Sequence, residues 1–157
     1  MNILEISPYL YLEAGNGGLF RSTGKGMHQT RIIDTWELIY VDSGTLHMAE
    51  NGIPFRVQAG QTLLLAPGRL HGGTQPYDQD LTFYWFHFTL HPGNNQNTPY
   101  SSAKKWSFPQ QTTITAPDRM RELAQLFLAD QEISPHDPVR SSLMLLLILR
   151  ELQRPNQ

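Results

Sequence analysis

Between residues 36 and 66 the chain is divided into short apolar segments by turns that recur about every eight residues. The turn sequences are DSG (42–44), ENG (50–52) and QAG (58–60). The segments around them are rich in β-branched and aromatic residues, which favour strands. These segments are 36–41, 45–49, 53–57 and 62–66. A longer segment of the same kind follows at 81–90, and 105–108 is a possible last edge strand. Evenly spaced short strands predict an antiparallel sandwich or barrel.

The segment 81–90 is apolar on both of its faces. Its odd positions include Phe83, Trp85 and His87, and its even positions include Tyr84, Phe86, Phe88 and Leu90. Successive side chains of a strand point to opposite faces, so a strand with two apolar faces is covered twice. We expect one face to look into a barrel and the other to lie beneath helices.

The pattern becomes helical after residue 115. Apolar residues recur at helical spacing at Met120, Leu123, Ala124 and Phe127. They predict an amphipathic helix that continues to about Gln131. Thr115 is its expected N-cap, with Asp118 as the capping-box partner.

A second helix is expected from the Asp137 N-cap and Pro138 to about Gln153. Its middle, LMLLLIL (143–149), is apolar around nearly its whole circumference, and such a helix must be buried on more than one side. Either the first helix covers the second side or another copy of the chain does. We favour a homodimer. The expected dimerisation residues are Leu143, Leu146, Leu147 and Arg150.

Composition excludes several classes of protein. The chain has 157 residues, the size of one domain, and a net charge of −2, so no basic face indicates nucleic-acid binding. It has no cysteine, which excludes disulfide scaffolds and thiolate metal sites and fits a cytoplasmic location. The longest apolar run is too short to span a bilayer, and the N-terminus lacks the pattern of a secretory signal. We therefore expect a cytoplasmic protein without membrane contact.

Two spaced motifs resemble those of the metal-binding cupin barrels. In the first, Glu37 and Gly44 occupy the glutamate and glycine positions, but the two histidine positions fall on Arg31 and Ile33. The second motif places its histidine after a Gly, a Pro-x-Gly turn and two further residues. Its counterparts here are Gly60, Ala66 in place of the first proline, Pro67, Gly68 and His71.

Only two of the four cupin ligands remain, Glu37 and His71. A divalent transition ion needs three or more converging imidazole or carboxylate ligands, and a guanidinium at Arg31 would repel it. The sequence therefore predicts no metal, no other cofactor and no catalysis.

Three longer segments resemble, in order, the N-terminal domain of AraC-type transcriptional regulators. They are WELIYVDSG (36–44), AGQTLLLAPGRLHGG (59–73) and FYWFHF (83–88), and the resemblance covers about residues 5–153. It implies a mainly β fold, a cupin-like jelly-roll barrel followed by two dimerisation helices. It also implies a small-molecule effector and an attached helix-turn-helix domain, through which alone DNA would be contacted.

This resemblance divides the chain into three parts. Residues 1–115 would form the effector-binding barrel with an N-terminal arm, and residues 116–153 the two-helix dimerisation segment. Residues 154–157 would begin the linker to the DNA-binding domain, which lies outside this chain.

The expected effector site combines an aromatic surface with hydrogen-bonding groups. The position of Glu37 in the cupin motif implies that it points inward. Strand alternation then directs Arg31, Ile39 and Val41 to the same face, and His71 points in from the facing strand. Trp85 resembles the tryptophan that stacks on the sugar in the arabinose-responsive member of the family, which implies a sugar-like effector. The expected effector-binding residues are Arg31, Glu37, His71, Phe83, Trp85, His87 and, from an arm over the ligand, Tyr9.

Each of these roles has a structural alternative. Trp85 could be a core aromatic residue, Arg31 and Glu37 could only neutralise each other, and His71 could only stabilise the Pro-Gly turn. Residues 8–20 could be an ordinary edge strand rather than an arm. For the whole chain, the alternatives are a metal-dependent cupin enzyme, such as a sugar isomerase or dioxygenase, and a free-standing cupin binding module.

Overall fold

The computed structural model describes residues 2–6, 11–91, 106–133 and 135–153. Within these ranges, antiparallel strands form two main sheets. The five-stranded sheet has the order β11 (Gln111–Thr113), β7 (Gln61–Leu65), β4 (Trp36–Ser43), β9 (Thr82–His91) and β2 (Tyr11–Arg21). The four-stranded sheet has the order β3 (Arg31–Ile32), β8 (Leu70–Gly73), β5 (Thr45–Glu50) and β6 (Ile53–Gln58). A separate pair joins β1 (Ile3–Ile6) to β10 (Trp106–Pro109).

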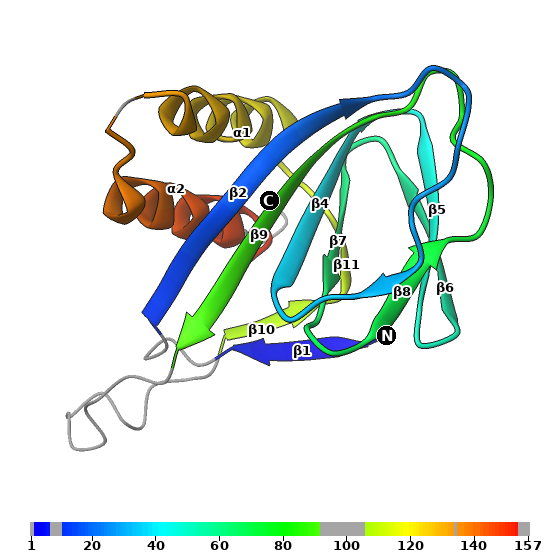
Figure 1. Cartoon of the computed structure of the whole chain (residues 1–157), viewed down its shortest axis with the longest axis horizontal. Helices are drawn as coiled ribbons and strands as arrows, with labels where there is room; N and C mark the ends of the chain where they lie inside the picture. Colours follow the sequence, from blue (N-terminus) through cyan, green and yellow to red (C-terminus); the bar gives the residue numbers. More distant parts are fainter. Residues whose placement is uncertain (1, 7–10, 92–105, 134, 154–157) are drawn as a thin grey trace.

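The two sheets face each other, and two helices cover the outer side of the five-stranded sheet (Figure 1). The helices are α1 (Pro117–Gln131) and α2 (Pro138–Glu151). The predicted fold class, a mainly β double-sheet barrel followed by two helices, is confirmed. No helix in the described part of the chain is long and apolar enough to cross a membrane.

Strand β4 shows how side-chain alternation separates two hydrophobic cores. Ile39 and Val41 point between the sheets, whereas Leu38 and Tyr40 belong to the core beneath the helices. Strand β9 divides in the same way: Phe83 packs between the sheets, and Tyr84, Phe86 and Phe88 pack toward the helices. The expectation that this strand is covered on both faces is confirmed.

The predicted strands match β4, β5, β6, β7, β9 and β10 to within two residues at each end. The structure also decides the N-terminal segment: residues 11–21 form β2, an edge strand paired along β9, so the edge-strand alternative is correct there. Tyr9 lies outside the described residues.

The strands that sequence reasoning missed are β1, β3, β8 and β11, each at most four residues long. Segments this short carry too few alternations to be recognised without their partners.

The predicted N-cap of α1 is wrong. Helix α1 begins at Pro117 with Ala116 as its N-cap, and no side chain caps it. Thr115 lies one residue too early for its hydroxyl to serve as the cap. Asp118 instead forms an ion pair of 3.0 Å with Arg121 one turn on.

The predicted N-cap of α2 is confirmed. The Asp137 carboxylate accepts hydrogen bonds of 3.1 Å from the amides of Val139 and Arg140. Replacing Asp137 by alanine should lower the free energy of unfolding by about 1 kcal/mol, because two amides of the first turn lose their acceptor. Urea denaturation measures this change. Thr115→Ala is the matched control and should stay within about 0.5 kcal/mol of the parent protein; an equal loss in both would contradict the assignment.

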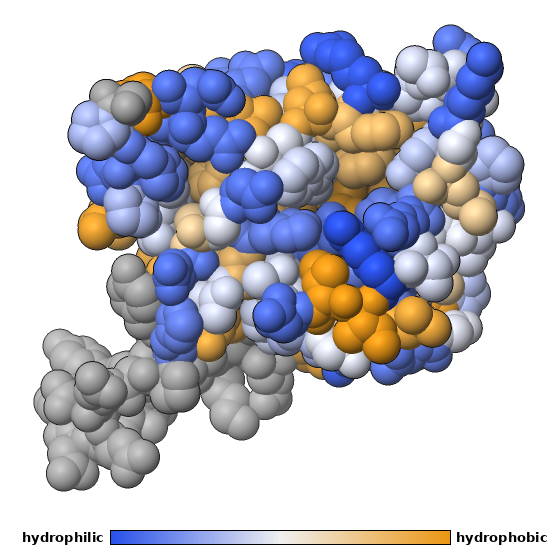
Figure 2. All heavy atoms as spheres, in the orientation of Figure 1, coloured by the Kyte–Doolittle hydropathy of each residue, from blue (hydrophilic) through white to orange (hydrophobic). Residues whose placement is uncertain are grey.

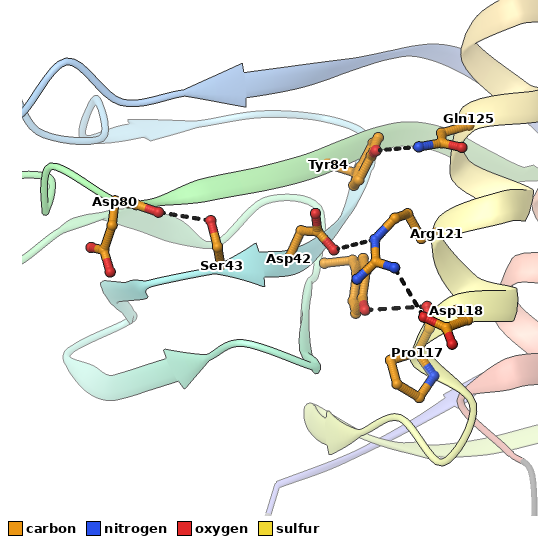
Figure 3. Close-up of polar contacts among 9 residues, drawn as sticks. Asp42, Ser43, Asp80, Tyr84, Pro117, Asp118, Arg121 and Gln125 are labelled. Atoms are coloured by element: carbon orange, nitrogen blue, oxygen red, sulfur yellow. Dashed lines mark hydrogen bonds and ion pairs between the residues drawn. The ribbon is translucent and has the colours of Figure 1, made fainter.

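Polar contacts also join α1 to the end of β4 (Figure 3). The Arg121 guanidinium donates to Asp42 at 2.8 Å and to Asp118 at 3.0 Å. Nearby, the Gln125 amide lies 3.5 Å from the Tyr84 hydroxyl. Helix α1 is thus held to the strand that carries Glu37 at its other end.

Candidate functional site

A cavity of about 390 Å³ opens between the two sheets, within the range of roughly 300 to 1,000 Å³ that is usual for small-molecule sites. Figure 2 shows a recessed hydrophobic surface between hydrophilic side chains on this face of the molecule. Strands β2, β3, β4 and β9 and the loops before β3 and β9 supply its lining. The lining residues are Asn16, Phe20, His28, Gln29, Arg31, Glu37, Tyr77, Phe83, Trp85 and His87.

One side of the cavity is aromatic. Phe20 stacks on Phe83 with their ring centroids 4.8 Å apart, and Tyr77 lies against Phe20 at 4.6 Å. Trp85 continues this surface along β9, because residues two apart on a strand share a face. Its indole lies directly on Gly18 of β2, where an added Cβ would come within 2.5 Å of the ring. This close approach requires glycine and sets the position of the indole.

The other side of the cavity is polar and is built around Glu37. Strand pairing brings its neighbours together: Glu37 lies opposite His87 across β4 and β9, and Arg31 lies opposite His71 across β3 and β8. Glu37 Oε2 is 3.5 Å from an Arg31 guanidinium nitrogen and 3.6 Å from His71 Nε2, and Glu37 Oε1 is 3.5 Å from His87 Nε2. Three side chains, drawn from both sheets, thus meet at the Glu37 carboxylate.

These contacts are too long to satisfy the groups that make them. Glu37 Oε2, both ring nitrogens of His71, His87 Nε2 and Arg31 Nε are buried without a hydrogen-bond partner. A buried polar atom without a partner costs about 1–3 kcal/mol, and native proteins contain few of them. Their concentration at one place indicates a site that is completed by a bound group.

His28 is one of the lining residues that sequence reasoning missed, with Asn16, Phe20, Gln29 and Tyr77. It lies in the loop before β3, and its ring centroid is 5.6 Å from that of His71. Backbone hydrogen bonding from Gly73 to the His28 carbonyl, at 3.0 Å, holds the loop against β8. No motif marks His28, because its spacing from Glu37 matches neither cupin motif.

Burial and charge decide the protonation of this cluster. Burial lowers the pKa of His71 and of His28, although the Glu37 carboxylate acts in the opposite direction. Burial alone would raise the pKa of Glu37, but contact with His87 and the charges of His87, His28 and Arg31 hold it below its ordinary value. Near neutral pH these shifts favour an ionised Glu37 carboxylate beside the neutral imidazoles of His28 and His71.

The structure brings most of the predicted site residues together. Arg31, Glu37, Phe83, Trp85 and His87 line the cavity. His71 does not: its side chain is fully buried, with Nε2 3.6 Å from Glu37 Oε2. The alternative that His71 only stabilises the Pro-Gly turn is wrong, because neither ring nitrogen has a hydrogen-bond partner.

Three of the buried groups could hold a metal ion. One ligand atom each from His28, Glu37 and His71 lies within 4.8 Å of the others. Two of these residues, Glu37 and His71, occupy ligand positions of the cupin motifs, and His28 supplies the third ligand.

The profile of the AraC-like ligand binding domain family matches residues 18–149. The chain belongs to this family. The match includes both main sheets except the first part of β2, together with most of the two-helix segment, and ligand binding in this family fits a cavity between the sheets.

A curated relative of this AraC-like domain is the uncharacterized HTH-type transcriptional regulator YisR of Bacillus subtilis (strain 168). The two are 37% identical over 90 residues, which is 57% of this chain and 30% of YisR. The chain therefore spans less than a third of the length of this relative.

Solved structures similar to the domain include KdgF from Halomonas sp., with 12% identity, a TM-score of 0.40 and coverage of 55% of this chain and 86% of that one. A cupin protein from Bacteroides fragilis has 13% identity, a TM-score of 0.35 and coverage of 56% and 73%. At these identities and scores, neither likeness assigns a function.

Proposed function

We propose that this AraC-like domain senses a small, sugar-like effector in its cavity and forms a homodimer through α2. In the whole regulator it would control a helix-turn-helix domain that binds DNA. The observation that carries the proposal is the two-sided cavity, aromatic along Phe20, Phe83 and Trp85 and polar around Glu37.

A sugar suits the chemistry of both sides of the cavity. Its C–H face is apolar and packs on a flat indole such as that of Trp85, which is half-buried at the cavity wall. Its hydroxyls both donate and accept hydrogen bonds, so they can satisfy the carboxylate of Glu37 and the ring nitrogen of His87, which lack partners. A purely apolar ligand would leave these groups buried and unsatisfied.

A sensing role also fits the position of β2 between the cavity and the helices. Asn16 on this strand lines the cavity. The next residue, Gly17, donates from its amide to the Gln131 side chain of α1 at 3.1 Å and accepts from it at 2.7 Å. A ligand that displaces Asn16 therefore acts on a segment bonded directly to α1.

The proposed dimer contact is the outer face of α2. Leu143 and Leu147, one turn apart, are 58% and 49% exposed, whereas Leu145, Ile148 and Leu149 are buried. Helix α1 therefore does not cover this second apolar side. Arg150, at the C-terminal end of the same stripe, is also exposed.

Sugar binding is tested with D-glucose, D-xylose, L-arabinose, L-rhamnose and D-glucuronate. We expect at least one of these sugars to raise the Tm of the chain saturably. Trp85→Ala should weaken that binding about tenfold to hundredfold, because the stacking surface is lost. The measurements are thermal denaturation and isothermal titration calorimetry.

The matched control is Trp36→Phe. Trp36 stacks on Phe88 at 6.1 Å on the helix side of the sheet, away from the cavity, so its replacement should leave sugar affinity unchanged. Unchanged affinity in Trp85→Ala, or no response to any of the five sugars, would contradict a sugar-like effector.

A further inference from the structure

Two buried carboxylates of the barrel differ in how their oxygens are satisfied. Glu50 accepts a hydrogen bond of 2.8 Å from the Ala66 amide and also contacts Arg69 and the Gln110 amide. Glu37 is equally buried, at 2% exposure, yet its Oε2 has no hydrogen-bond partner. The fold therefore satisfies one internal carboxylate completely and leaves the other available.

Beside the Arg31 guanidinium, two groups near this oxygen are of types that bind metal ions. His71 Nε2 lies 3.6 Å away, and a ring nitrogen of His28 completes a group of three within 4.8 Å. Ligand atoms around a tetrahedral ion with bonds of about 2.0 Å are about 3.3 Å apart. The contact between His71 and Glu37 is already close to this spacing, and all three side chains are buried.

The hydrogen bond of His28 has the arrangement found at metal-binding histidines. Its Nδ1 lies 3.0 Å from the carbonyl oxygen of Gln29, which can only accept a hydrogen bond. Nδ1 therefore carries the proton, and Nε2 is left with a free lone pair. Such a bond to a backbone carbonyl orients the ring of a metal ligand and selects its tautomer.

We infer that His28, Glu37 and His71 bind a divalent first-row transition metal ion. His87 Nε2, 3.5 Å from Glu37 Oε1 and without a hydrogen-bond partner, is within reach as a fourth ligand. Two or three imidazoles and one carboxylate suit zinc, nickel, iron or copper. Magnesium and calcium prefer shells of oxygen ligands and do not fit this donor set.

Arg31 is the group that opposes a metal ion here. Its guanidinium is 3.5 Å from Glu37 Oε2 and neutralises the carboxylate in the metal-free protein. However, its side chain is 34% exposed at the cavity wall, so it has room to extend away from an incoming cation. The three proposed ligands are buried and have no such freedom.

An ion in this position would lie at the polar end of the effector cavity, since His28 and Glu37 both line it. An ion held by three protein ligands retains coordination positions for oxygen donors of a bound molecule. The metal site itself does not rest on the sensing role proposed above, because its ligands come from the protein alone.

The test is isothermal titration calorimetry of Zn²⁺ and Ni²⁺ into the chain, freed of any affinity tag and of metal by chelation, with no sugar present. We expect one saturable site for each chain. At a metal concentration about a hundredfold above Kd, the Tm should rise by about 5–10 °C. Mg²⁺ at the same concentrations should produce neither signal.

Two variants and one control locate the site. His28→Gln and Glu37→Gln should each weaken Zn²⁺ binding at least about tenfold, since losing even an outer-shell partner of a metal ligand costs this much. His47→Gln is the matched control, because His47 alternates on β5 with the inward Leu46 and Met48 and so points out of the barrel. Its affinity should equal that of the parent protein.

His28→Gln decides the outcome if Glu37→Gln does not fold, because His28 lies in a loop outside both sheets. The inference is overturned if the parent chain shows no saturable Zn²⁺ or Ni²⁺ site. It is also overturned if His28→Gln binds as tightly as the parent chain, or if Mg²⁺ gives the same shift in Tm. Loss of sugar binding with retained Zn²⁺ binding would contradict only the proposed effector.

Discussion

Replacing Phe127 by alanine should lower the free energy of unfolding by about 3–5 kcal/mol, the cost of removing a large aromatic side chain from a packed core. Phe127 is fully buried on the inner face of α1. Its ring packs edge-on against Phe86 of β9, with the centroids 5.2 Å apart. Stabilities of single domains are about 5–15 kcal/mol, so the loss would be a large fraction of the total.

The adjacent residue provides the matched control. Leu126 is 55% exposed on the same helix, so Leu126→Ala should change stability by no more than about 0.5 kcal/mol. The measurement is guanidinium denaturation at one fixed protein concentration, because dimerisation would make stability depend on concentration. Equal losses for Phe127→Ala and Leu126→Ala would show that α1 does not pack on the sheet as described.

Replacing both Leu143 and Leu147 by aspartate should abolish the proposed dimer. Each leucine that is buried at an interface contributes about 1.5–3 kcal/mol, and each change occurs in both copies. Four charged side chains in an apolar contact should weaken the dimer by at least about a thousandfold. Sedimentation velocity should show the parent chain as a dimer and the double variant as a monomer at the same concentration.

Ile53→Asp is the control for this experiment. Ile53 is 46% exposed, close to the exposure of Leu147, but it lies on β6 in the sheet that the helices do not cover. Its replacement should leave the dimer intact. A parent chain that stays monomeric at every concentration measured, or a double variant that stays dimeric, would contradict α2 as the seam.

Much of the fold was predictable because strand alternation is a local property. The alternation in 81–90 predicted two covered faces, and the structure places Phe83 between the sheets and Phe86 beneath the helices. The same rule predicted that Ile39 and Val41 share the face of Glu37, which its motif position directed inward, and all three lie between the sheets. The cap at Asp137 was also predictable, since its acceptor and the amides it binds are two and three residues apart.

Predictions failed where a distance in space mattered more than one along the chain. Thr115 has the residue type of an N-cap, but the chain begins its helix one residue later, at Pro117. The two-residue strand β3 exists only because β8 pairs with it, so the sequence could not show that Arg31 lies opposite His71. His71 was expected to line the cavity, and only the folded structure shows that its side chain is fully buried and is not part of the lining.

The sequence by itself determined the longer strands, the two apolar faces of β9 and the helical segment, because each follows from side-chain period within one segment. The inward direction of Glu37 followed from its position in the cupin motif. The tertiary structure alone decided which groups surround that carboxylate. His28 and Glu37 are brought together by a loop that packs against β8, and no local period encodes such a contact. For this reason the sequence showed two metal-ligand types in the cupin motifs, whereas the folded chain gathers three.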